Sequence, residues 1–394
     1  MRIAIDSGGT FTDCVYVDDG QLKVLKIFST PQHPSQAVFD AVLKVTHEGA
    51  RPEVRHGTTV GTNAMLERKG ARVAYVTTAG FEDVIAIGRQ ARQSLYDWFH
   101  SPMPCIVPPA LRFGVEERTS AEGRVLRSPT SEHLTRLRAE IRESGAESIA
   151  LSLLFSFANP HNERLVTQAL ETLGLPISIS HEILPEFREY ERGSTVVTNA
   201  YLAPKVSSYI RELERSLTDR FPAGRVQVMQ SSGGIVSASL SAREPVRTVL
   251  SGPAGGVIGA YRIACIAGFT KVIGFDMGGT STDVSLMDAA EGGPKTTTES
   301  IVSGLPISVQ CSIFTPWGRA GGHLHASTTG ARCTWARNPQ VHYLAPSVMA
   351  KDNTRPSLTP TSSLGALIPT YSSEEKYISM TGTRVRSWSV NAAA

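Results

Sequence analysis

The chain is poor in cysteine, and it lacks any long uninterrupted run of apolar residues. Its five cysteines among 394 residues form no CxxC pair and no disulfide framework, which predicts reduced and mostly buried thiols. A membrane-spanning helix needs about 20 consecutive apolar residues, and the sequence holds no such run. Because an apolar strand begins directly after Met1, we expect no signal peptide, no contact with a membrane and a cytoplasmic protein. The cysteines are Cys14, Cys105, Cys265, Cys311 and Cys333.

A strong charge of either sign is also missing. The formal net charge is +3, but residues after 310 hold eight Lys and Arg against three Asp and Glu, whereas residues 1–310 hold 31 against 33. The larger part of the chain therefore has no excess of positive charge, which argues against nucleic acid as a partner. Three of the four tryptophans also lie after residue 310. Both shifts indicate that the composition changes near this position.

One eight-residue pattern, D-x-G-G-T-x-T-D, occurs at residues 6–13 and again at residues 276–283. Apolar runs flank both copies, so each predicts a strand, a Gly-Gly turn and a second strand, which together form a β-hairpin. Two such hairpins predict two related lobes that bind one polyanion between them, and a nucleoside triphosphate with its metal is the natural candidate. Two ordinary glycine-rich turns are the alternative, but chance rarely repeats the hydroxyls and both carboxylates.

The residue types of this pattern suit the binding of phosphate. Glycines let backbone amides approach phosphate oxygens, and threonine hydroxyls can donate to the same oxygens. Asp6 and Asp276 would repel phosphate, but a hydrated Mg²⁺ between carboxylate and phosphate removes that conflict. We therefore expect Asp6 and Asp276 to bind the metal and to take part in catalysis. The predicted nucleotide-binding residues are Gly8, Gly9, Thr10, Thr12, Asp13, Gly278, Gly279, Thr280, Ser281, Thr282 and Asp283.

Helical and strand patterns alternate along the chain, which predicts an α/β protein of two lobes. We expect helices over residues 35–47 and 195–215, and Pro204 should start a new segment or kink the second of them. Residues 128–157 predict a helix followed by a strand, and residues 56–64 predict a polar turn that leads into a helix. Further strands are expected at residues 72–77 and 225–229.

Residues 250–260, L-S-G-P-A-G-G-V-I-G-A, precede the second copy of the pattern. Pro253 suits the first turn of a helix, and the small residues allow two backbones to pack closely. This segment predicts a helix that crosses between the lobes and shifts as a cleft closes. A tightly packed buried helix without motion is the alternative, and the two do not exclude each other.

These motifs resemble the hydantoinase/5-oxoprolinase family, within the actin-like and sugar-kinase ATPase superfamily. The resemblance covers residues 1 to about 309 and implies two actin-like (ribonuclease H-like) lobes with a nucleotide cleft between them. The implied domains are a hydantoinase/oxoprolinase N-terminal domain over residues 1–185 and a partial hydantoinase A domain over residues 186–310. The segments that carry the resemblance are residues 3–13, 56–63, 77–89, 250–260 and 275–286.

The resemblance implies an ATP-dependent hydrolase that opens a cyclic amide such as 5-oxoproline or a hydantoin, with ATP and Mg²⁺ as cofactors. Phosphorylation of the lactam oxygen would create a reactive imidate phosphate that water can attack. Related acetone carboxylase subunits use ATP to activate other small carbonyl compounds. A small-molecule kinase and a non-catalytic nucleotide-binding remnant are the alternatives. A hydantoinase B-type subunit or domain, or a second copy of the chain, would be the partner.

The residue that activates water is not evident from the sequence. His56, Asn63, Glu186 and Glu189 are candidates by residue type, and we take His56 as the catalytic candidate. A histidine whose hydrogen bonds are satisfied by its own turn is the alternative for His56.

The resemblance ends near residue 310. The family continues there with a run like M-L-D-I-H-T-V-G-A-G-G, which residues 310–320 do not contain. A permitted codon choice for these residues, read two bases later, gives M-L-D-I-H-T-V-G-A-G. Residues 335–342 yield another family run, G-P-E-S-A-G-A, in the same way. We hypothesise that residues 311–394 are translated out of frame, and a lineage-specific disordered tail is the alternative.

An irregular tail and an incomplete second lobe would follow from such a shift. Apolar strands without partners favour aggregation. We therefore expect weak Mg·ATP binding and no ring opening by the 394-residue chain. Resequencing the transcript across codons 305–320 tests the reading frame, and ATP-dependent hydrolysis of 5-oxoproline by the purified chain would contradict both expectations.

Overall fold

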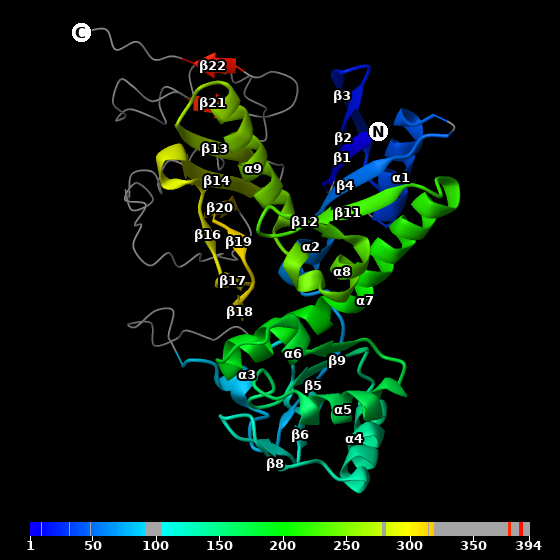
Figure 1. The fold of residues 1–394 in the computed structure, drawn as a ribbon, viewed down its shortest axis with the longest axis vertical. Coiled ribbons are helices and arrows are strands. Elements are labelled where there is room, and N and C mark those ends of the chain that lie inside the picture. The colour runs from blue at the N-terminus through cyan, green and yellow to red at the C-terminus, as the bar shows by residue number, and fades with distance from the viewer. Residues whose placement is uncertain are drawn as a thin grey trace, which may run out of the picture.

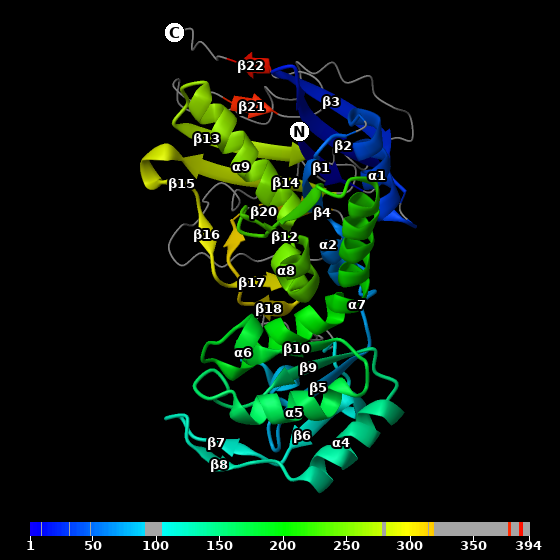
Figure 2. The same cartoon turned by 45° about the vertical axis from the view of Figure 1, so that its right-hand side comes forward.

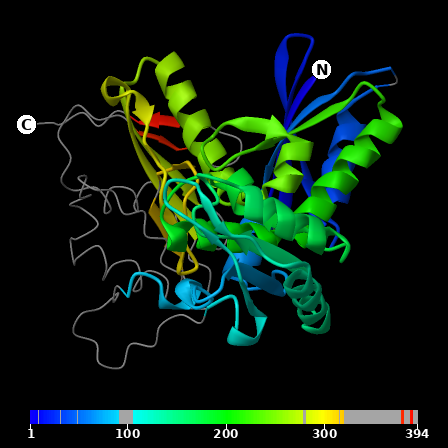
Figure 3. The same cartoon turned by 60° about the horizontal axis from the view of Figure 1, so that its bottom comes forward.

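The structure, a computed structural model, describes residues 1–8, 10–30, 32–47, 49–90, 105–277, 281–313, 315–318, 377–379 and 386–388. These residues form three main sheets with helices packed against them, so that the fold is mixed α/β as expected (Figure 1). Figure 2 and Figure 3 show from two other directions that the N-terminal sheet, the sheet around β5 and the sheet around β13 occupy separate blocks.

The first block holds a six-stranded sheet in the order β12-β11-β4-β1-β2-β3. Its strands are β1 (Arg2–Ser7), β2 (Phe11–Asp18), β3 (Gln21–Phe28), β4 (Glu53–Thr58), β11 (Arg225–Met229) and β12 (Ile235–Ser237). Alternate residues of β1 are buried, and Ile3 and Ile5 join a core that includes residues of helices α1 (Pro34–Val45) and α7 (Glu189–Arg220). β11 and β12 lie beyond residue 185, so this sheet takes strands from both sides of the expected domain boundary.

The second block holds a parallel sheet in the order β10-β9-β5-β6. Its strands are β5 (Val73–Thr78), β6 (Arg112–Val115), β9 (Ser148–Ser152) and β10 (Ile177–Ile179). Every residue of β5 and β9 is buried, as is usual for parallel strands that are covered on both faces. The surrounding elements are α3 (Val84–Ile87), η1 (Pro109–Leu111), β7 (Arg118–Thr119), β8 (Val125–Arg127), α4 (Ser131–Glu143), α5 (His161–Glu171) and α6 (Ser180–Ile183).

The third block is built on the second hairpin, β13 (Lys271–Met277) and β14 (Ser281–Asp288), beside helix α9 (Ser251–Ile266) (Figure 1). β15 (Gly293–Pro294) and β20 (Thr315–Gly318) both pair with β14. The remaining short elements are η3 (Ala289–Glu291), β16 (Thr296–Thr297), β17 (Ser300–Val302), β18 (Leu305–Ile307), β19 (Cys311–Ser312), β21 (Tyr377–Ser379) and β22 (Arg386–Trp388). Most of the tail expected after residue 310 lies outside the described residues, and its described parts belong to β19 to β22.

Helix α7 is longer than expected and continues through Pro204 for 32 residues in all. The helix joins the first two blocks. The Ser148 hydroxyl of β9, in the second block, donates to the carbonyl of Ala200. The Ser207 hydroxyl donates to the carbonyl of Ala242, which follows β12 of the first block. Nineteen of its residues are buried, so packing along most of its length outweighs the hydrogen bond that a proline removes. The expected new segment at Pro204 is therefore not observed.

Two other expectations need revision. Residues 56–58 belong to β4 rather than to a turn, and helix α2 (Val60–Leu66) follows directly. The four described cysteines are free thiols, but only Cys14 and Cys311 are buried, whereas Cys265 is exposed. Cys333 lies outside the described residues.

None of the helices in the described ranges combines the length and the apolarity that a membrane span requires. Two short elements, α8 (Ala238–Arg243) and η2 (Pro245–Thr248), lead from β12 to α9.

Candidate active site

The first D-x-G-G-T-x-T-D copy forms the expected hairpin. Strands β1 and β2 pair Asp6 with Asp13, and the amide of Gly8 donates to the carbonyl of Phe11 at 3.0 Å to close the turn. A Cβ atom at Gly8 would lie 3.2 Å from that carbonyl oxygen, so the tight turn favours glycine here. Because side chains alternate across a strand, the cross-strand pair Asp6 and Asp13 shares the open face of the sheet.

Thr12 faces the other way, which corrects its expected role. Its side chain has no exposed surface, and its hydroxyl bonds to the Ser29 hydroxyl at 3.0 Å and to that of Ser7 at 3.5 Å. A buried hydroxyl with these partners fixes the hairpin and cannot reach a phosphate. Thr10 is exposed at the turn, where the expected phosphate contact is sterically open, and Gly9 lies outside the described residues.

The second copy repeats the register of the first. β13 and β14 pair Asp276 with Asp283, as β1 and β2 pair Asp6 with Asp13. The turn residues Gly278, Gly279 and Thr280 lie outside the described residues, as do the side chains of Ser281 and Thr282. The backbone thus confirms that both copies are hairpins, and each hairpin has an aspartate pair just below its turn.

The two hairpins face each other closely enough for their charges to interact. Burial and, to a smaller extent, the negative charges of Asp276 and Asp13 together raise the pKa of Asp6 from 3.8 to about 6. Burial followed by the charge of Asp276 raises the pKa of Asp283 to about 6, and burial raises the pKa of Asp276. The Asp6 and Asp276 side chains nevertheless remain accessible to solvent, which is the setting of groups on the walls of a cleft.

These carboxylates fit a divalent cation that takes only part of its ligands from protein. Lys26 neutralises Asp13 in an ion pair at 3.1 Å, whereas every interaction that acts on the pKa of Asp6 raises it. Within the described ranges, no three acidic, histidine or cysteine side chains converge to hold a metal ion by themselves. Mg²⁺ usually takes one or two carboxylates and completes its shell with phosphate oxygens and water. Asp6 and Asp276 would supply those carboxylates.

Helix α9 connects the second hairpin to the first block. The Ser251 hydroxyl donates to the carbonyl of Thr58 at 3.1 Å, and the amide of Leu250 donates to the Thr62 hydroxyl at 2.8 Å. Leu250 has a φ of +67°, a left-handed conformation that a leucine rarely adopts without constraint from its surroundings. The start of α9 is therefore fixed against the end of β4, directly beside the first aspartate pair. This is the place expected for a helix that crosses between the lobes.

Two glycines lie against Asp6 and Asp276, the aspartates that we expect to bind the metal, and they predict a graded response to alanine. A Cβ atom at Gly57 would lie 3.1 Å from Asp6 Oδ1, whereas one at Gly256 would lie at an ordinary 3.6 Å from Asp276 Oδ2. We expect Gly57→Ala to displace the Asp6 carboxylate and to weaken Mg²⁺-dependent binding of an ATP analogue by about fivefold, or about 1 kcal/mol. Gly256→Ala should change it by less than about twofold. Calorimetric titration of both variants tests this order, and equal losses would contradict it.

His56 does not meet the requirements of a catalytic residue, which corrects a second expectation. Its ring is fully buried, and burial lowers its pKa to about 4, so it is neutral at physiological pH. Nδ1 lies 3.2 Å from the carbonyl oxygen of Ile5, and Nε2 lies 2.5 Å from the Tyr209 hydroxyl. Its partners come from β1 and α7 rather than from its own turn. No reacting atom can touch this ring.

The other candidates for activating water are not brought together with the hairpins. Asn63 is exposed on α2. Glu189 pairs with the buried guanidinium of Arg192, and the carbonyl of Glu186 accepts a hydrogen bond from the same arginine at 3.0 Å. Glu186 lies just before α7 and Glu189 is its first residue, and this end of the helix lies beside the second block and away from β1 (Figure 1). Residue type alone suggested these candidates, so their distance from the hairpins was not predictable.

The aspartate cluster predicts how stability depends on pH. Groups whose pKa is raised by folding contribute stability below their ordinary value near 3.8, and this contribution is lost as the pH rises through about 6. Asp6→Asn removes one such group, so its melting temperature should match the wild type near pH 4 and exceed it increasingly up to pH 7. The lowered pKa of His56 acts in the opposite direction, but it is common to both proteins. A gap that stays constant over this pH range would contradict the clustering.

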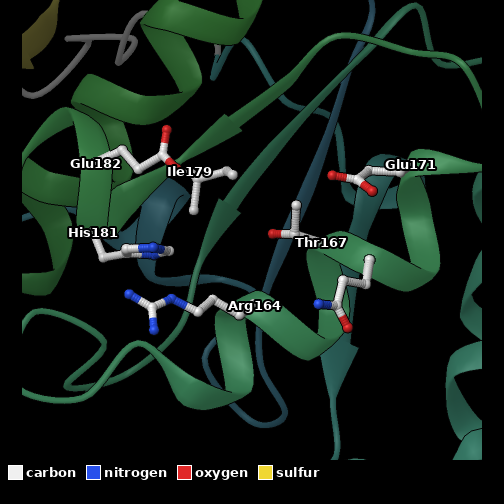
Figure 4. A pocket seen from close by; sticks show the side chains of 7 residues that line it. Arg164, Thr167, Glu171, Ile179, His181 and Glu182 are labelled. Carbon is white, nitrogen blue, oxygen red and sulfur yellow. The ribbon is translucent and has the colours of Figure 1, made fainter.

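A hollow of about 350 Å³ lies elsewhere, on the second block between α5, β10 and α6. Figure 4 shows Arg164 and His181 lying side by side in it, with Thr167 and Glu171 across from them. His181 Nδ1 lies 2.6 Å from Glu163, a carboxylate without exposed surface that also accepts from the amide of Leu153. None of the predicted site residues lines this hollow. The repeated aspartates and not the hollow therefore define the candidate active site.

Comparisons with known proteins show which proteins this chain resembles. The family model of the hydantoinase/oxoprolinase N-terminal region matches residues 2–174, and that of hydantoinase/oxoprolinase matches residues 192–371. 5-Oxoprolinase of Saccharomyces cerevisiae is 33% identical over 332 residues, which cover 72% of this chain and 26% of that protein. Caprolactamase subunit alpha of Pseudomonas jessenii is 31% identical over 301 residues, which cover 72% of this chain and 43% of the subunit.

A solved structure extends the likeness to the fold. The nucleotide-free structure of acetone carboxylase, described in connection with ATP-dependent acetone carboxylation, superposes with a TM-score of 0.73 at 27% identity. The match covers 83% of this chain and 51% of that one. The chain thus spans between about a quarter and a half of the length of these relatives. From its two matched regions and its fold, the chain belongs to the hydantoinase/oxoprolinase family.

Proposed function

We propose that this chain binds the triphosphate of Mg·ATP between its two hairpins, for the ATP-dependent opening of a cyclic amide such as 5-oxoproline or a hydantoin. The observation that carries the proposal is the repeated aspartate pair. Asp6 with Asp13 and Asp276 with Asp283 hold the same register below two turns, and their charges interact across the lobes. Such a cluster is unfavourable unless a cation binds there.

The relatives support the class of substrate. The yeast relative is a 5-oxoprolinase and the bacterial one a caprolactamase subunit, and both names describe proteins that act on cyclic amides. The structural relative is associated with an ATP-dependent reaction of acetone, which is also a small carbonyl compound. A carbonyl oxygen activated by ATP is the chemistry that these reactions share. The subunit name of the caprolactamase relative supports a partner subunit for this chain as well.

The proposed chemistry proceeds through phosphate esters of the lactam. The lactam oxygen attacks the γ-phosphorus, the bond from that phosphorus to the β,γ-bridging oxygen breaks, and ADP leaves. Water then adds to the imidate carbon, and the ring C–N bond breaks as the nitrogen takes a proton. The resulting acyl phosphate is hydrolysed by a second water to a carboxylate and inorganic phosphate. One ATP and two waters are consumed for each ring that opens.

The residues of this chain would position the triphosphate and neutralise its negative charge, and they would not exchange protons with the substrate. Backbone amides of the Gly8 turn and of its counterpart after Asp276 would hold phosphate oxygens, and the exposed Thr10 hydroxyl would donate to them. Mg²⁺, held by Asp6 and Asp276, would offset the charge of the transferring phosphate. Thr12 and His56 are not part of this set, because both are fully buried.

The test is ATP turnover and nucleotide binding by the purified chain. Mg²⁺-dependent binding of a non-hydrolysable ATP analogue at one site per chain is the expected result. Phosphate release stimulated by 5-oxoproline or a hydantoin would establish the full activity, although we still expect the 394 residues alone not to open the ring. Stimulation by glucose or glycerol instead would show a kinase. Absence of Mg²⁺-dependent binding would refute the proposal.

A further inference from the structure

A buried polar chain connects helix α7 to the strand that carries Asp6. The Tyr209 hydroxyl of α7 lies 2.5 Å from Nε2 of His56, and Nδ1 of that ring lies 3.2 Å from the carbonyl oxygen of Ile5. Both the Tyr209 and the His56 side chains are buried.

The direction of each hydrogen bond in this series follows from the carbonyl of Ile5 at its end. A carbonyl oxygen can only accept, so Nδ1 of His56 carries the proton and donates to Ile5. Nε2 is then the acceptor, and the Tyr209 hydroxyl donates to it. One arrangement of protons therefore satisfies both ring nitrogens of His56 and the Tyr209 hydroxyl, and the other neutral tautomer of His56 leaves the carbonyl of Ile5 without this donor.

The series of hydrogen bonds ends at the peptide bond that joins Ile5 to Asp6. In the sheet, Ile5 lies opposite His56 and Asp6 lies opposite Gly57. The carbonyl that accepts from His56 therefore belongs to the same peptide plane as the amide of Asp6. A rotation of this plane would move the Asp6 carboxylate, whose Oδ1 lies in the space that the missing side chain of Gly57 leaves open.

We propose that Tyr209 and His56 are positioning residues, which hold the Ile5–Asp6 peptide so that the Asp6 carboxylate meets the metal of the bound nucleotide. This inference rests on the proposed function for its consequence but not for its geometry. Two apolar side chains of similar size would fill the same space without the cost of burying two polar side chains. A satisfied polar chain instead allows one orientation of β1 relative to α7.

The first experiment is a double-mutant cycle on Mg²⁺-dependent nucleotide binding. For each variant of the full chain, calorimetry gives the affinity for AMP-PNP with Mg²⁺ and with EDTA, and their ratio is the metal-dependent gain. Tyr209→Phe should reduce this gain about fivefold, since it removes one hydrogen bond and keeps the ring. In an Asp6→Asn background the same change should have an effect of less than about twofold. Tyr201→Phe, on the same helix, is the matched control and should leave the gain unchanged.

His56→Gln separates positioning from proton transfer. A glutamine amide can donate to the carbonyl of Ile5 and accept from Tyr209, so the gain should stay within about twofold of the wild type. The proposal would be overturned if His56→Gln reduced the metal-dependent gain as much as Tyr209→Phe does. It would also be overturned if Tyr209→Phe reduced the gain equally in the wild-type and the Asp6→Asn backgrounds.

Hydrogen exchange gives a second readout that needs no nucleotide. In Tyr209→Phe, peptides that cover residues 2–8 should exchange about tenfold faster, whereas peptides from β9 and α5 should keep their rates. Unchanged exchange at residues 2–8, or a uniform increase over the chain, would overturn the positioning role. If the wild type shows no metal-dependent gain but the exchange result holds, the proposed function fails and the positioning role stands.

Discussion

Replacing Asp6 by asparagine is expected to weaken the Mg²⁺-dependent binding of an ATP analogue by roughly 10- to 150-fold. A hydrogen bond or contact to a charged group contributes about 1.5–3 kcal/mol, which corresponds to this change in affinity. The same substitution should raise the melting temperature of the nucleotide-free protein at pH 7, because it removes one of several mutually repelling carboxylates. Opposite signs for binding and stability are typical of a site where function and stability conflict.

Asp18→Asn is the matched control for this prediction. Asp18 lies at the end of β2, the partner strand of β1, and its carboxylate is nearly half exposed and pairs with Lys23 at 2.6 Å. We expect no change in nucleotide affinity and little change in stability. Asp276→Asn should behave like Asp6→Asn, since the two residues hold the same place in their hairpins. Wild-type affinity in either of these two variants would contradict the role that we assign to them.

Arg192→Met is expected to destabilise the protein by about 3 kcal/mol or more, because it leaves buried partners unpaired. The Arg192 side chain has no exposed surface, pairs with Glu189, and donates to the carbonyl of Leu153 at 2.6 Å and to that of Glu186 at 3.0 Å. These bonds join the start of α7 to the end of β9. Denaturation by urea, followed by circular dichroism, measures the loss as a lower midpoint.

Arg188→Met supplies the comparison for Arg192. Arg188 lies four residues earlier and forms an ion pair with Glu299, but both side chains are nearly half exposed. An exposed pair contributes about 0–1 kcal/mol, so the midpoint should move little. Equal effects of the two substitutions would show that the buried network around Arg192 does not stabilise the second block.

The hairpins were predictable because their signal is local. A Gly-Gly turn between two apolar runs determines a hairpin wherever it lies, and the second copy added the expectation of a second lobe. The register of the strands was not predictable to the same degree. Thr12 belongs to the same motif as Asp13, but it faces the interior because successive side chains of a strand alternate. A one-residue difference in position thus separates a candidate ligand contact from a structural residue.

The roles of His56 and Tyr209 depend on contacts that no local pattern shows. They are 153 residues apart in the chain, and only the packing of α7 against β4 brings their side chains together. The same holds for β11 and β12, which join the first sheet after more than 160 intervening residues. At Pro204 the local rule allowed either a new segment or a kink, and the packing of a long buried helix excludes the new segment.

A crystal structure of the chain with Mg²⁺ and AMP-PNP tests the central claim most directly. The account predicts a single nucleotide whose triphosphate lies between the turn at Gly8 and the turn after Asp276, with the metal within coordination distance of the carboxylates of Asp6 and Asp276. A nucleotide bound elsewhere, such as in the hollow at His181, or one that contacts a single hairpin and no aspartate, would contradict it.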